Sequence, residues 1–231
     1  MKLLAFETAT EACSVAVFID GDVRERFELA PRRHAELSLP WAEQLLAEGG
    51  ITRSQLDAIA IGRGPGAFTG VRLAIAIAQG IALALDRPIV PVSTLAALAM
   101  QSPGECILAA IDARMGEVYS AAFARDGDSL VAVSAESVGA PDAVLLPDTM
   151  QACHGVGTGF AAGESALQHR LGSRLSWVDA TALPHAADVA RLAAPAFARG
   201  EAMAPERVEP AYLRDNVALT IAEQQALRAS R

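Results

Sequence analysis

The fold is decided by residues 61–73, IGRGPGAFTGVRL, in which four glycines and one proline fall within nine positions. A strand-like run at residues 56–61 precedes this stretch, and an apolar helix pattern over residues 71–85 comes after it. Gly64-Pro65-Gly66 is typical of a tight turn, because proline presets one φ and glycine permits positive φ and close backbone approach. Thr69 is placed as the N-cap of the helix, since its hydroxyl can accept from first-turn amides.

A strand, a glycine-rich turn and a helix N-terminus also make up phosphate cradles, where free amides and the helix dipole favour an anion. The diagnostic signatures are not met here. A P-loop requires GxxxxGK[ST], and no lysine follows these glycines; the dinucleotide fingerprint GxGxxG would need glycine in place of Thr69. Local chemistry therefore favours a structural turn that holds a helix, with an anion cradle as the alternative.

The length, charge and residue composition of the chain limit its size class and the kinds of function it can have. The 231 residues, 52% of them hydrophobic, suffice for one large domain or two small ones. The net charge is −8 and Lys2 is the only lysine, so bulk electrostatics do not favour nucleic acid and lysine Schiff-base chemistry is excluded. The sequence shows no signal peptide. Its longest apolar stretch, residues 73–85, contains Gln79 and Gly80 and is expected to be too short to span a membrane, so we predict a cytoplasmic protein.

The three cysteines, Cys13, Cys106 and Cys153, are widely spaced and form neither CxxC nor a metal-ligand spacing. We expect them to be buried free thiols in a reducing compartment. The four histidines do not pair at i,i+3 or i,i+4, so no metal site is predicted.

The second half of the chain repeats the first. Residues 107–112 match residues 2–7, each an apolar strand that ends on an acid, and Asp126-Gly127-Asp128 repeats the hairpin signal Asp20-Gly21-Asp22. This duplication predicts two like α/β domains whose mixed sheets are flanked by helices. The expected boundary is at Ser102-Pro103-Gly104, giving an N-terminal domain over residues 1–102 and a C-terminal domain over residues 103–231.

Two strand-end acids, Glu7 and Asp112, hold equivalent places in this repeat. A site between the halves could pair their carboxylates for acid–base or metal-assisted chemistry. The alternative, which local sequence favours, is two acids that cap their own loops, because neither is followed by a DxG loop.

The helix over residues 71–85 is apolar nearly all round, and the helix over residues 35–48 carries Trp41. Such a helix is buried in a core or covered by a partner. The pattern leaves both interpretations open.

Two longer motifs carry a family resemblance. Residues 62–72, GRGPGAFTGVR, resemble the hallmark GxGPGSFTGLR, with Ala67 where serine is usual, and residues 111–119, IDARMGEVY, resemble a second hallmark, DARxGEVY. Glu7-Thr8-Ala9 is similar to a DTS/DTA opening, with Glu in place of Asp, and residues 33–40 and 210–214 also fit. Over residues 1–214 the chain is identified as a member of the bacterial TsaB (YeaZ-like) family of the glycoprotease-like (peptidase M22) superfamily.

The resemblance implies the actin-like ATPase (ASKHA) fold, two duplicated RNase-H-like domains. It also implies a non-catalytic subunit that supports TsaD, the enzyme that adds threonylcarbamoyl to N6 of the adenosine beside the anticodon in tRNAs reading codons that start with A. The expected partners are a TsaD-like subunit, a TsaE-like ATPase and, in isolation, a second copy of the chain. Contact with tRNA is expected only through the complex, no membrane is involved, and no cofactor is bound by this chain, since the complex uses the ATP. A nucleotide-binding ASKHA enzyme and, less favoured, a metallopeptidase are the alternatives.

The resemblance places the partner interface on the helices over residues 35–48 and 70–86. The residues expected there are His34, Leu37, Trp41, Leu45, Phe68, Val71, Arg72, Ile75 and Gln79. A vestigial nucleotide site is expected at Glu7, Thr8, Asp112 and Arg114. No catalytic and no metal-binding residue is predicted.

Overall fold

A computed structural model of the chain describes residues 1–214. The first of its two sheets has the strand order β3-β2-β1-β4-β5. Its central strand β1 runs antiparallel to β2 and parallel to β4, so the sheet is mixed. The strands are β1 (Lys2–Glu7), β2 (Ala12–Ile19), β3 (Asp22–Leu29), β4 (Ala58–Gly62) and β5 (Ile89–Val92).

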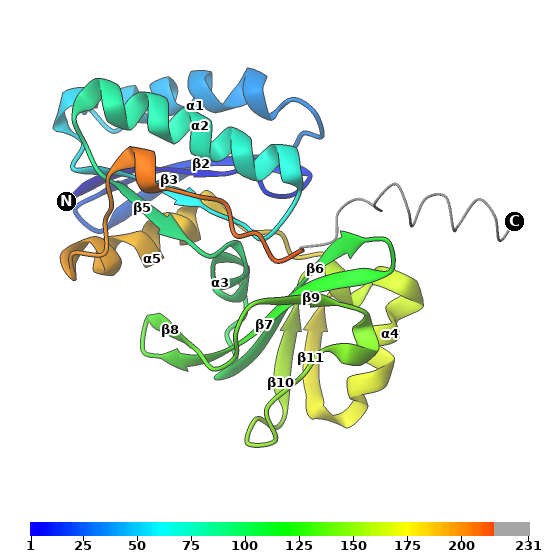
Figure 1. The fold of residues 1–231 in the computed structure, drawn as a ribbon. Helices are drawn as coiled ribbons and strands as arrows, with labels where there is room; N and C mark the ends of the chain where they lie inside the picture. Colours follow the sequence, from blue (N-terminus) through cyan, green and yellow to red (C-terminus); the bar gives the residue numbers. More distant parts are fainter. Residues whose placement is uncertain (215–231) are drawn as a thin grey trace, which may run out of the picture.

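The second sheet repeats this topology (Figure 1). Its order is β11-β10-β6-β7-β8, with a short β9 paired to β7. The central strand β6 again runs antiparallel to the next strand and parallel to the later one, which confirms the predicted duplication. The strands are β6 (Cys106–Arg114), β7 (Glu117–Asp126), β8 (Ser129–Ala132), β9 (Ser137–Gly139), β10 (Cys153–Val156) and β11 (Leu175–Asp179); β9 and β11 were not predicted.

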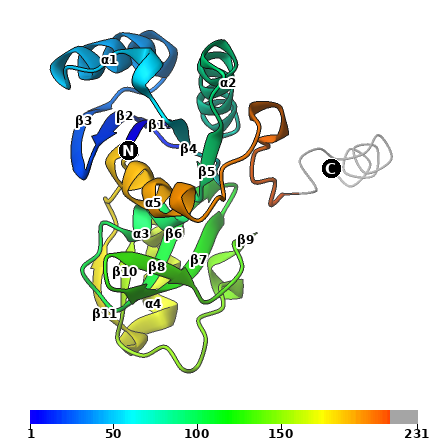
Figure 2. The ribbon, with the colours of Figure 1, turned by 90° about the vertical axis from the view of Figure 1, so that its left-hand side faces the viewer.

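Helices cover both sheets. The helices α1 (His34–Glu48) and α2 (Phe68–Leu85) pack on one face of the first sheet, and α5 (Ala186–Ala198) packs on its other face (Figures 1 and 2). Helix α4 (Ala162–Leu171) covers the second sheet, and α3 (Thr94–Ala99) packs on that sheet's opposite face, toward the first sheet. The prediction of mixed sheets flanked by helices is confirmed. We call β1–β5 with their helices the first unit, and β6–β11 with α4 the second unit.

Helix α5 departs from the predicted division of the chain. The boundary at residues 102–103 does separate the two sheets. The prediction that everything after residue 103 belongs to the second domain is wrong, because side chains along α5 pack with Leu3, Ala5 and Ala60 of the first sheet. The physical reason is that a mixed sheet needs cover on both faces, and α1 and α2 cover only one.

A C-terminal strap, residues 199–214, continues from α5 and joins the two units. Met203 exchanges backbone hydrogen bonds with Ile89 on β5, and the amide of Ala211 donates to the carbonyl of Arg63 at 2.9 Å. Arg214 then reaches β6 and β7, donating to the carbonyl of Ala113 at 3.2 Å and forming an ion pair with Glu117. The strap therefore fixes the second unit against the first.

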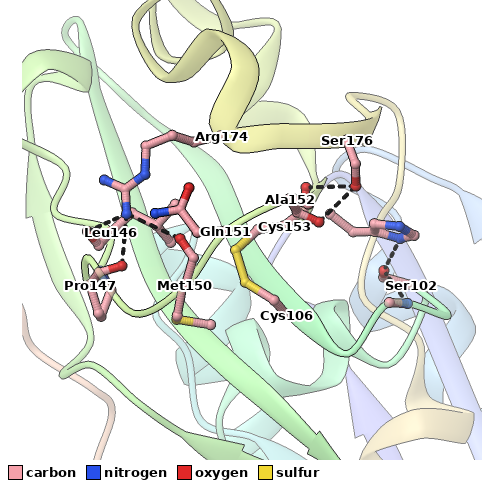
Figure 3. The surroundings of a disulfide bond; sticks show 12 residues. Ser102, Cys106, Leu146, Pro147, Met150, Gln151, Ala152, Cys153, Arg174 and Ser176 are labelled. Atoms are coloured by element: carbon pink, nitrogen blue, oxygen red, sulfur yellow. Dashed lines mark hydrogen bonds between the residues drawn. A yellow bond between two sulfur atoms is a disulfide. The ribbon is translucent and has the colours of Figure 1, made fainter.

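Cys106 and Cys153 form a disulfide, shown in Figure 3. The prediction of free thiols is wrong for these two residues and holds for Cys13, which is free and buried. They lie side by side on β6 and β10, with a Cα–Cα distance of 4.6 Å across 47 residues of sequence. Strand register brings them together, which spacing alone cannot reveal. Arg174 closes the neighbouring loop by donating to the carbonyls of Leu146, Pro147 and Met150 (Figure 3).

Helix boundaries differ from expectation in two places. Helix α2 begins at Phe68 with Ala67 as its N-cap, so the prediction that Thr69 caps it is wrong. The sequence after Pro141 also predicts a short helix over residues 140–146, but the structure has only a 3-10 turn there, Pro141–Ala143. Helix α2 is also longer than the apolar stretch expected from sequence. By length and composition alone its 18 residues could cross a membrane, a test that the core helix of a soluble protein also passes.

Candidate functional site

The glycine loop, residues 62–70, is built around the buried carboxylate of Glu7. A Cβ at Gly62 would collide with that carboxylate. The hydroxyl of Thr94 donates to Glu7 Oε2 at 2.9 Å and accepts from the amide of Gly64 at 3.2 Å. The first glycine of the loop therefore makes room for the acid, and Thr94 ties the loop to it.

The other end of the loop seats α2 on the turn between β1 and β2. A Cβ at Gly70 would collide with the carbonyl of Thr8, and one at Gly66 with that of Ala9. The Thr8 hydroxyl donates to the carbonyl of Gly70 at 2.8 Å, and the amide of Ala67 donates to the carbonyl of Ala9 at 2.7 Å. The loop thus acts as a rigid turn that launches α2, in line with the interpretation favoured from sequence.

Glu7 and Asp112 have different surroundings. Burial raises the pKa of Glu7 to about 7, against the lowering effect of hydrogen bonds from the Ala9 amide and Thr94. Asp112 is half-buried and accepts from the Arg114 amide at 2.8 Å and the Arg114 guanidinium at 2.7 Å. Asp112 lines a pocket between the two units, whereas Glu7 does not, so that pocket does not bring Glu7 and Asp112 together as a pair.

This interdomain pocket has a volume of about 550 Å³. It lies between the β1–β2 turn, the start of α2, the end of β6 and the C-terminal strap. Of the four residues expected at a vestigial nucleotide site, Asp112 and Arg114 line the pocket, while Glu7 and Thr8 are buried beneath its wall. Sequence reasoning did not place Arg32, Tyr212 and Arg214 at this site, because separate segments bring them there.

The nine residues expected at the partner interface fall into two groups. Leu45, Val71 and Ile75 are buried in the core between α1, α2 and the first sheet, so their expected position on the surface is wrong. The helices are apolar on several sides, and only packing decides which side turns inward. The other six are exposed or half-buried: His34, Leu37, Trp41, Phe68, Arg72 and Gln79.

Three of those six have structural bonds. Nε2 of His34 lies 3.0 Å from the carbonyl of Thr10 and 3.1 Å from that of Ala12, which anchors the start of α1. Gln79 donates to the carbonyl of Pro205 in the strap at 2.8 Å. The guanidinium of Arg72 lies 3.3 Å from the ring centre of Phe68 and donates to the Tyr212 hydroxyl at 2.6 Å.

The outward side of α2 is apolar. Leu83 is 63% exposed and Phe68 is 64% exposed, and Ala76, Gly80 and Ala84 of the same helix are exposed too. We call this side of α2, with the exposed Leu39 on α1, the helical face. Leu83 and Leu39 were not predicted. The buried positions of α2, residues 71, 74, 75, 78 and 82, follow helical spacing. The remaining residues of α2 therefore form an outward side that includes Leu83, and this periodicity is the sequence signal that could have identified Leu83.

A half-buried polar cluster at the start of α5 is structural. His185 Nδ1 lies 2.8 Å from Glu25, Ser14 donates to Glu25 at 2.7 Å, and the Phe27 ring stacks on His185 with centres 4.1 Å apart. Burial lowers the pKa of His185, but the Glu25 carboxylate outweighs it and the net shift is upward. The Ser14 hydroxyl faces Glu25 and not the imidazole, so the arrangement ties α5 to β2 and β3. Among residues 1–214 no group of three or more His, Cys, Asp and Glu side chains could hold a metal ion.

Comparisons with known proteins agree on one family. The family model of TsaD, tRNA N6-adenosine threonylcarbamoyltransferase, matches residues 28–222. The tRNA threonylcarbamoyladenosine biosynthesis protein TsaB of Escherichia coli K12 is 44% identical, over 94% of this chain and 96% of the relative. The TsaB protein of Haemophilus influenzae is 37% identical, over 94% of this chain and 95% of the relative.

A solved structure shows the same fold. YeaZ from Pseudomonas aeruginosa superimposes with a TM-score of 0.85 at 44% identity, covering 92% of this chain and 99% of that one. The two duplicated sheets with their flanking helices are therefore a YeaZ-like architecture.

Proposed function

Since the chain belongs to the TsaB (YeaZ-like) family of tRNA threonylcarbamoyladenosine biosynthesis proteins, we propose that it is the non-catalytic subunit that binds and supports a TsaD-like transferase. The complex places a threonylcarbamoyl group on N6 of the adenosine beside the anticodon, in tRNAs reading codons that start with A. In this proposal the chain acts by association and the reacting atoms lie in its partner.

The helical face is the observation that carries the proposal. Leu83 and Phe68 expose most of their surface on a helix whose opposite side is packed in the core. Exposed apolar helices of this kind are typical of protein–protein contacts, because burying them removes apolar surface from water. Within residues 1–214 the strap bonds to α2 at Gln79 and at Arg72, and Leu83 keeps 63% of its surface exposed.

The partner is inferred from the chain's own resemblance. The matching family model is that of TsaD, so we expect a TsaD-like subunit to share the fold of residues 28–214 and to carry helices equivalent to α1 and α2. Two such helix pairs can pack face to face by interlocking their side chains, as helices do in bundles. A second copy of this chain presents the same face, which accounts for a homodimer when TsaD is absent.

The remaining roles depend on this assignment. A TsaE-like ATPase joins the complex and uses its ATP, and this chain needs no cofactor of its own for its supporting role. The site of action is the cytoplasm, where the tRNA substrate is handled, and the complex as a whole positions the tRNA. Neither alternative function gains support: Glu7 does not join Asp112 in the pocket, and the described residues hold no metal-ligand group.

A matched pair of leucines tests the proposal. Leu83 on the helical face and Leu29 at the edge of the first sheet are 63% and 62% exposed. We expect Leu83→Asp to weaken binding to the TsaD-like subunit about 30-fold or more, because a charge replaces an apolar anchor at the contact. Leu29→Asp should bind like the wild type. Titration calorimetry of the purified pair measures the effect.

Two results would overturn the assignment. One is a Leu83→Asp protein that binds as tightly as the wild type while Leu29→Asp does not. The other is a purified TsaD-like subunit that, with the ATPase and substrates, modifies tRNA equally well without this chain. Thermal unfolding of both variants checks that each remains folded, since both side chains lie at the surface.

A further inference from the structure

The disulfide between Cys106 and Cys153 belongs to a protein whose proposed site of action, the cytoplasm, keeps thiols reduced. Disulfides that do form in such a compartment are usually transient, catalytic or redox-sensing. The two cysteines lie on the neighbouring strands β6 and β10 with their Cα atoms 4.6 Å apart. Three register pairs follow them along the strands, beginning with His154 opposite Ile107. This pairing keeps the cysteines near each other when the bond is open, so the bond can close again.

The two cysteines differ in exposure. Cys153 is fully buried, whereas Cys106 is half-buried at the start of β6, so Cys106 is the member of the pair that a molecule in solution reaches. Disulfides with an accessible sulfur are the labile and regulatory ones, because exchange begins when a thiolate approaches one of the two sulfurs.

The exchange at this bond has two steps. The thiolate of a small cellular thiol attacks Sγ of Cys106 and forms a mixed disulfide there, while Sγ of Cys153 leaves with the electron pair of the broken bond and takes up a proton. A second thiolate then attacks the small thiol's sulfur in the mixed disulfide, and Sγ of Cys106 leaves and is protonated. The protein gains two electrons and two protons, and two small thiols become one small disulfide.

The segment that leads into β10 depends on this bond at its end. Residues 144–152, which we call the loop before β10, contain neither a helix nor a strand. Arg174 holds the middle of the loop by donating to the carbonyls of Leu146, Pro147 and Met150 at 3.1, 2.7 and 3.1 Å (Figure 3). The disulfide fastens the position that directly follows the loop.

The loop before β10 buries apolar side chains in the second unit. Val144, Leu146 and Met150 pack in the core around β6, β7 and α4, and Leu145 between them is already exposed. Opening the bond therefore loosens a segment that, when released, presents new apolar surface.

The opposite end of the same strand pair does not depend on the bond. A Cβ at Gly157 would collide with the carbonyl of Ala110, so the turn after β10 rests directly on β6. The Thr158 hydroxyl also accepts from the Asp112 amide at 3.1 Å. Reduction is thus expected to act on the start of β10 and to leave the wall of the interdomain pocket in place.

We propose that Cys106–Cys153 is a reversible thiol–disulfide switch, which a small thiol opens by attack at Cys106 and which releases the loop before β10 when open. The inference rests on the proposed function only for the compartment in which the protein acts. The oxidised form holds the loop against the core of the second unit, and the reduced form exposes it. The helical face belongs to the first unit and is the same in both forms.

Glutathione buffers acting on the full, native chain test the switch. We expect the bond to open in excess reduced glutathione and to close again when oxidised glutathione replaces it, as counted by thiol alkylation and mass spectrometry. A matched pair of variants tests the point of attack. Cys153→Ala should take up one glutathione at Cys106 from oxidised glutathione, whereas Cys106→Ala should take up none at the buried Cys153.

Hydrogen exchange measures the structural effect. Backbone amides of residues 144–156 should exchange about tenfold faster or more in the reduced chain, because the cross-link no longer opposes local opening, and those of α2 should not change. Cys106→Ala should show the fast exchange in both buffers. Cys13→Ala is the control that should respond as the wild type does.

Three results would overturn the inference: a bond that stays closed in excess reduced glutathione, a bond that does not form again in oxidised glutathione, or equal exchange of residues 144–156 in the two forms. Association with the TsaD-like subunit is measured in both buffers. A switch that responds in a chain that does not associate refutes the proposed function alone, and tight association with an unresponsive bond refutes the switch alone.

Discussion

Glu7 ends β1 and Asp112 lies near the end of β6, so these acids hold the same place in the two copies of the sheet. Each accepts a hydrogen bond from the amide two residues later, at 2.7 Å for Glu7 and 2.8 Å for Asp112. Beyond that shared bond they diverge. Glu7 is sealed under the glycine loop, and Asp112 faces the interdomain pocket.

The difference lies in the segment after the parallel strand of each unit. After β4, the glycine loop folds over Glu7 and leads directly into the 18 residues of α2. After β10, the chain makes the 3-10 turn Thr158–Phe160 before the 10-residue helix α4, and the Thr158 hydroxyl accepts from the Asp112 amide. The same strand pattern therefore supports a closed end that leads into α2 and an open end that forms a pocket wall.

The largest loss of stability is expected from adding a side chain at Gly70, where α2 is seated on the turn between β1 and β2. Gly70→Ala places a Cβ against the carbonyl of Thr8, a backbone atom that cannot move aside, and should lower the free energy of unfolding by about 4 kcal/mol. Gly80→Ala, in the same helix with nothing near its Cβ, should be neutral or stabilise by up to about 1 kcal/mol. Urea denaturation compares the two, and equal stability would contradict the tight seating of α2.

The disulfide belongs to the second unit alone, so reduction should weaken that unit. Breaking Cys106–Cys153 releases a loop of 47 residues and is expected to cost about 3 kcal/mol. Urea denaturation with and without dithiothreitol measures this, and the double variant Cys106→Ala, Cys153→Ala should lose the dependence on reductant. Cys13→Ala is the control, and its stability should still depend on the reductant. Titration of three free thiols in the native, unreduced protein would refute the disulfide.

A smaller, pH-dependent effect distinguishes the two acids. The pKa of Glu7 is about 7 in the folded protein against 4.5 in the unfolded chain, so the native state holds its proton more tightly. Its contribution to stability is fully present below pH 4.5 and is lost as the pH rises through 7, by up to about 3 kcal/mol. Glu7→Gln should remove this dependence of the free energy of unfolding on pH between 4.5 and 7.

Asp112→Asn serves as the counterpart in the second unit. The ion pair of Asp112 with Arg114 is largely exposed, so we expect Asp112→Asn to change the free energy of unfolding by less than about 1 kcal/mol. Unfolding by urea at several pH values measures both variants. A Glu7→Gln protein with the same pH slope as the wild type would show that the carboxyl group of Glu7 is not buried as described.

Local sequence signals predicted much of the fold. The hairpin signals at Asp20-Gly21-Asp22 and Asp126-Gly127-Asp128 mark the turns after β2 and β7. The sequence also predicts a helix over residues 94–101 capped by Ser93, and Ser93 does accept from the amide of Ala96 at the start of α3. These succeed because turns and caps depend on residues within a few positions. Thr69 failed as a cap since the carbonyl of Ala9, distant in sequence, takes the Ala67 amide and starts the helix earlier.

The candidate site was predicted only in part. Asp112 and Arg114 come from a recognisable motif and do line the pocket, but Arg32, Tyr212 and Arg214 reach it from segments that no local pattern places beside them. On α2, an apolar pattern on every side hid which residues face the core, so Ile75 was expected outside and Leu83 was not singled out.

The sequence by itself determined the duplication, the strand–loop–helix order around residues 61–73 and the family, because each depends on local pattern or motif. Only the tertiary structure decided that α5 returns to the first sheet, that Cys106 meets Cys153, and that the strap completes a pocket between the units. Those contacts join residues far apart in the chain. Sheet register and the need to cover both faces of a sheet select them, and neither leaves a mark in the local sequence.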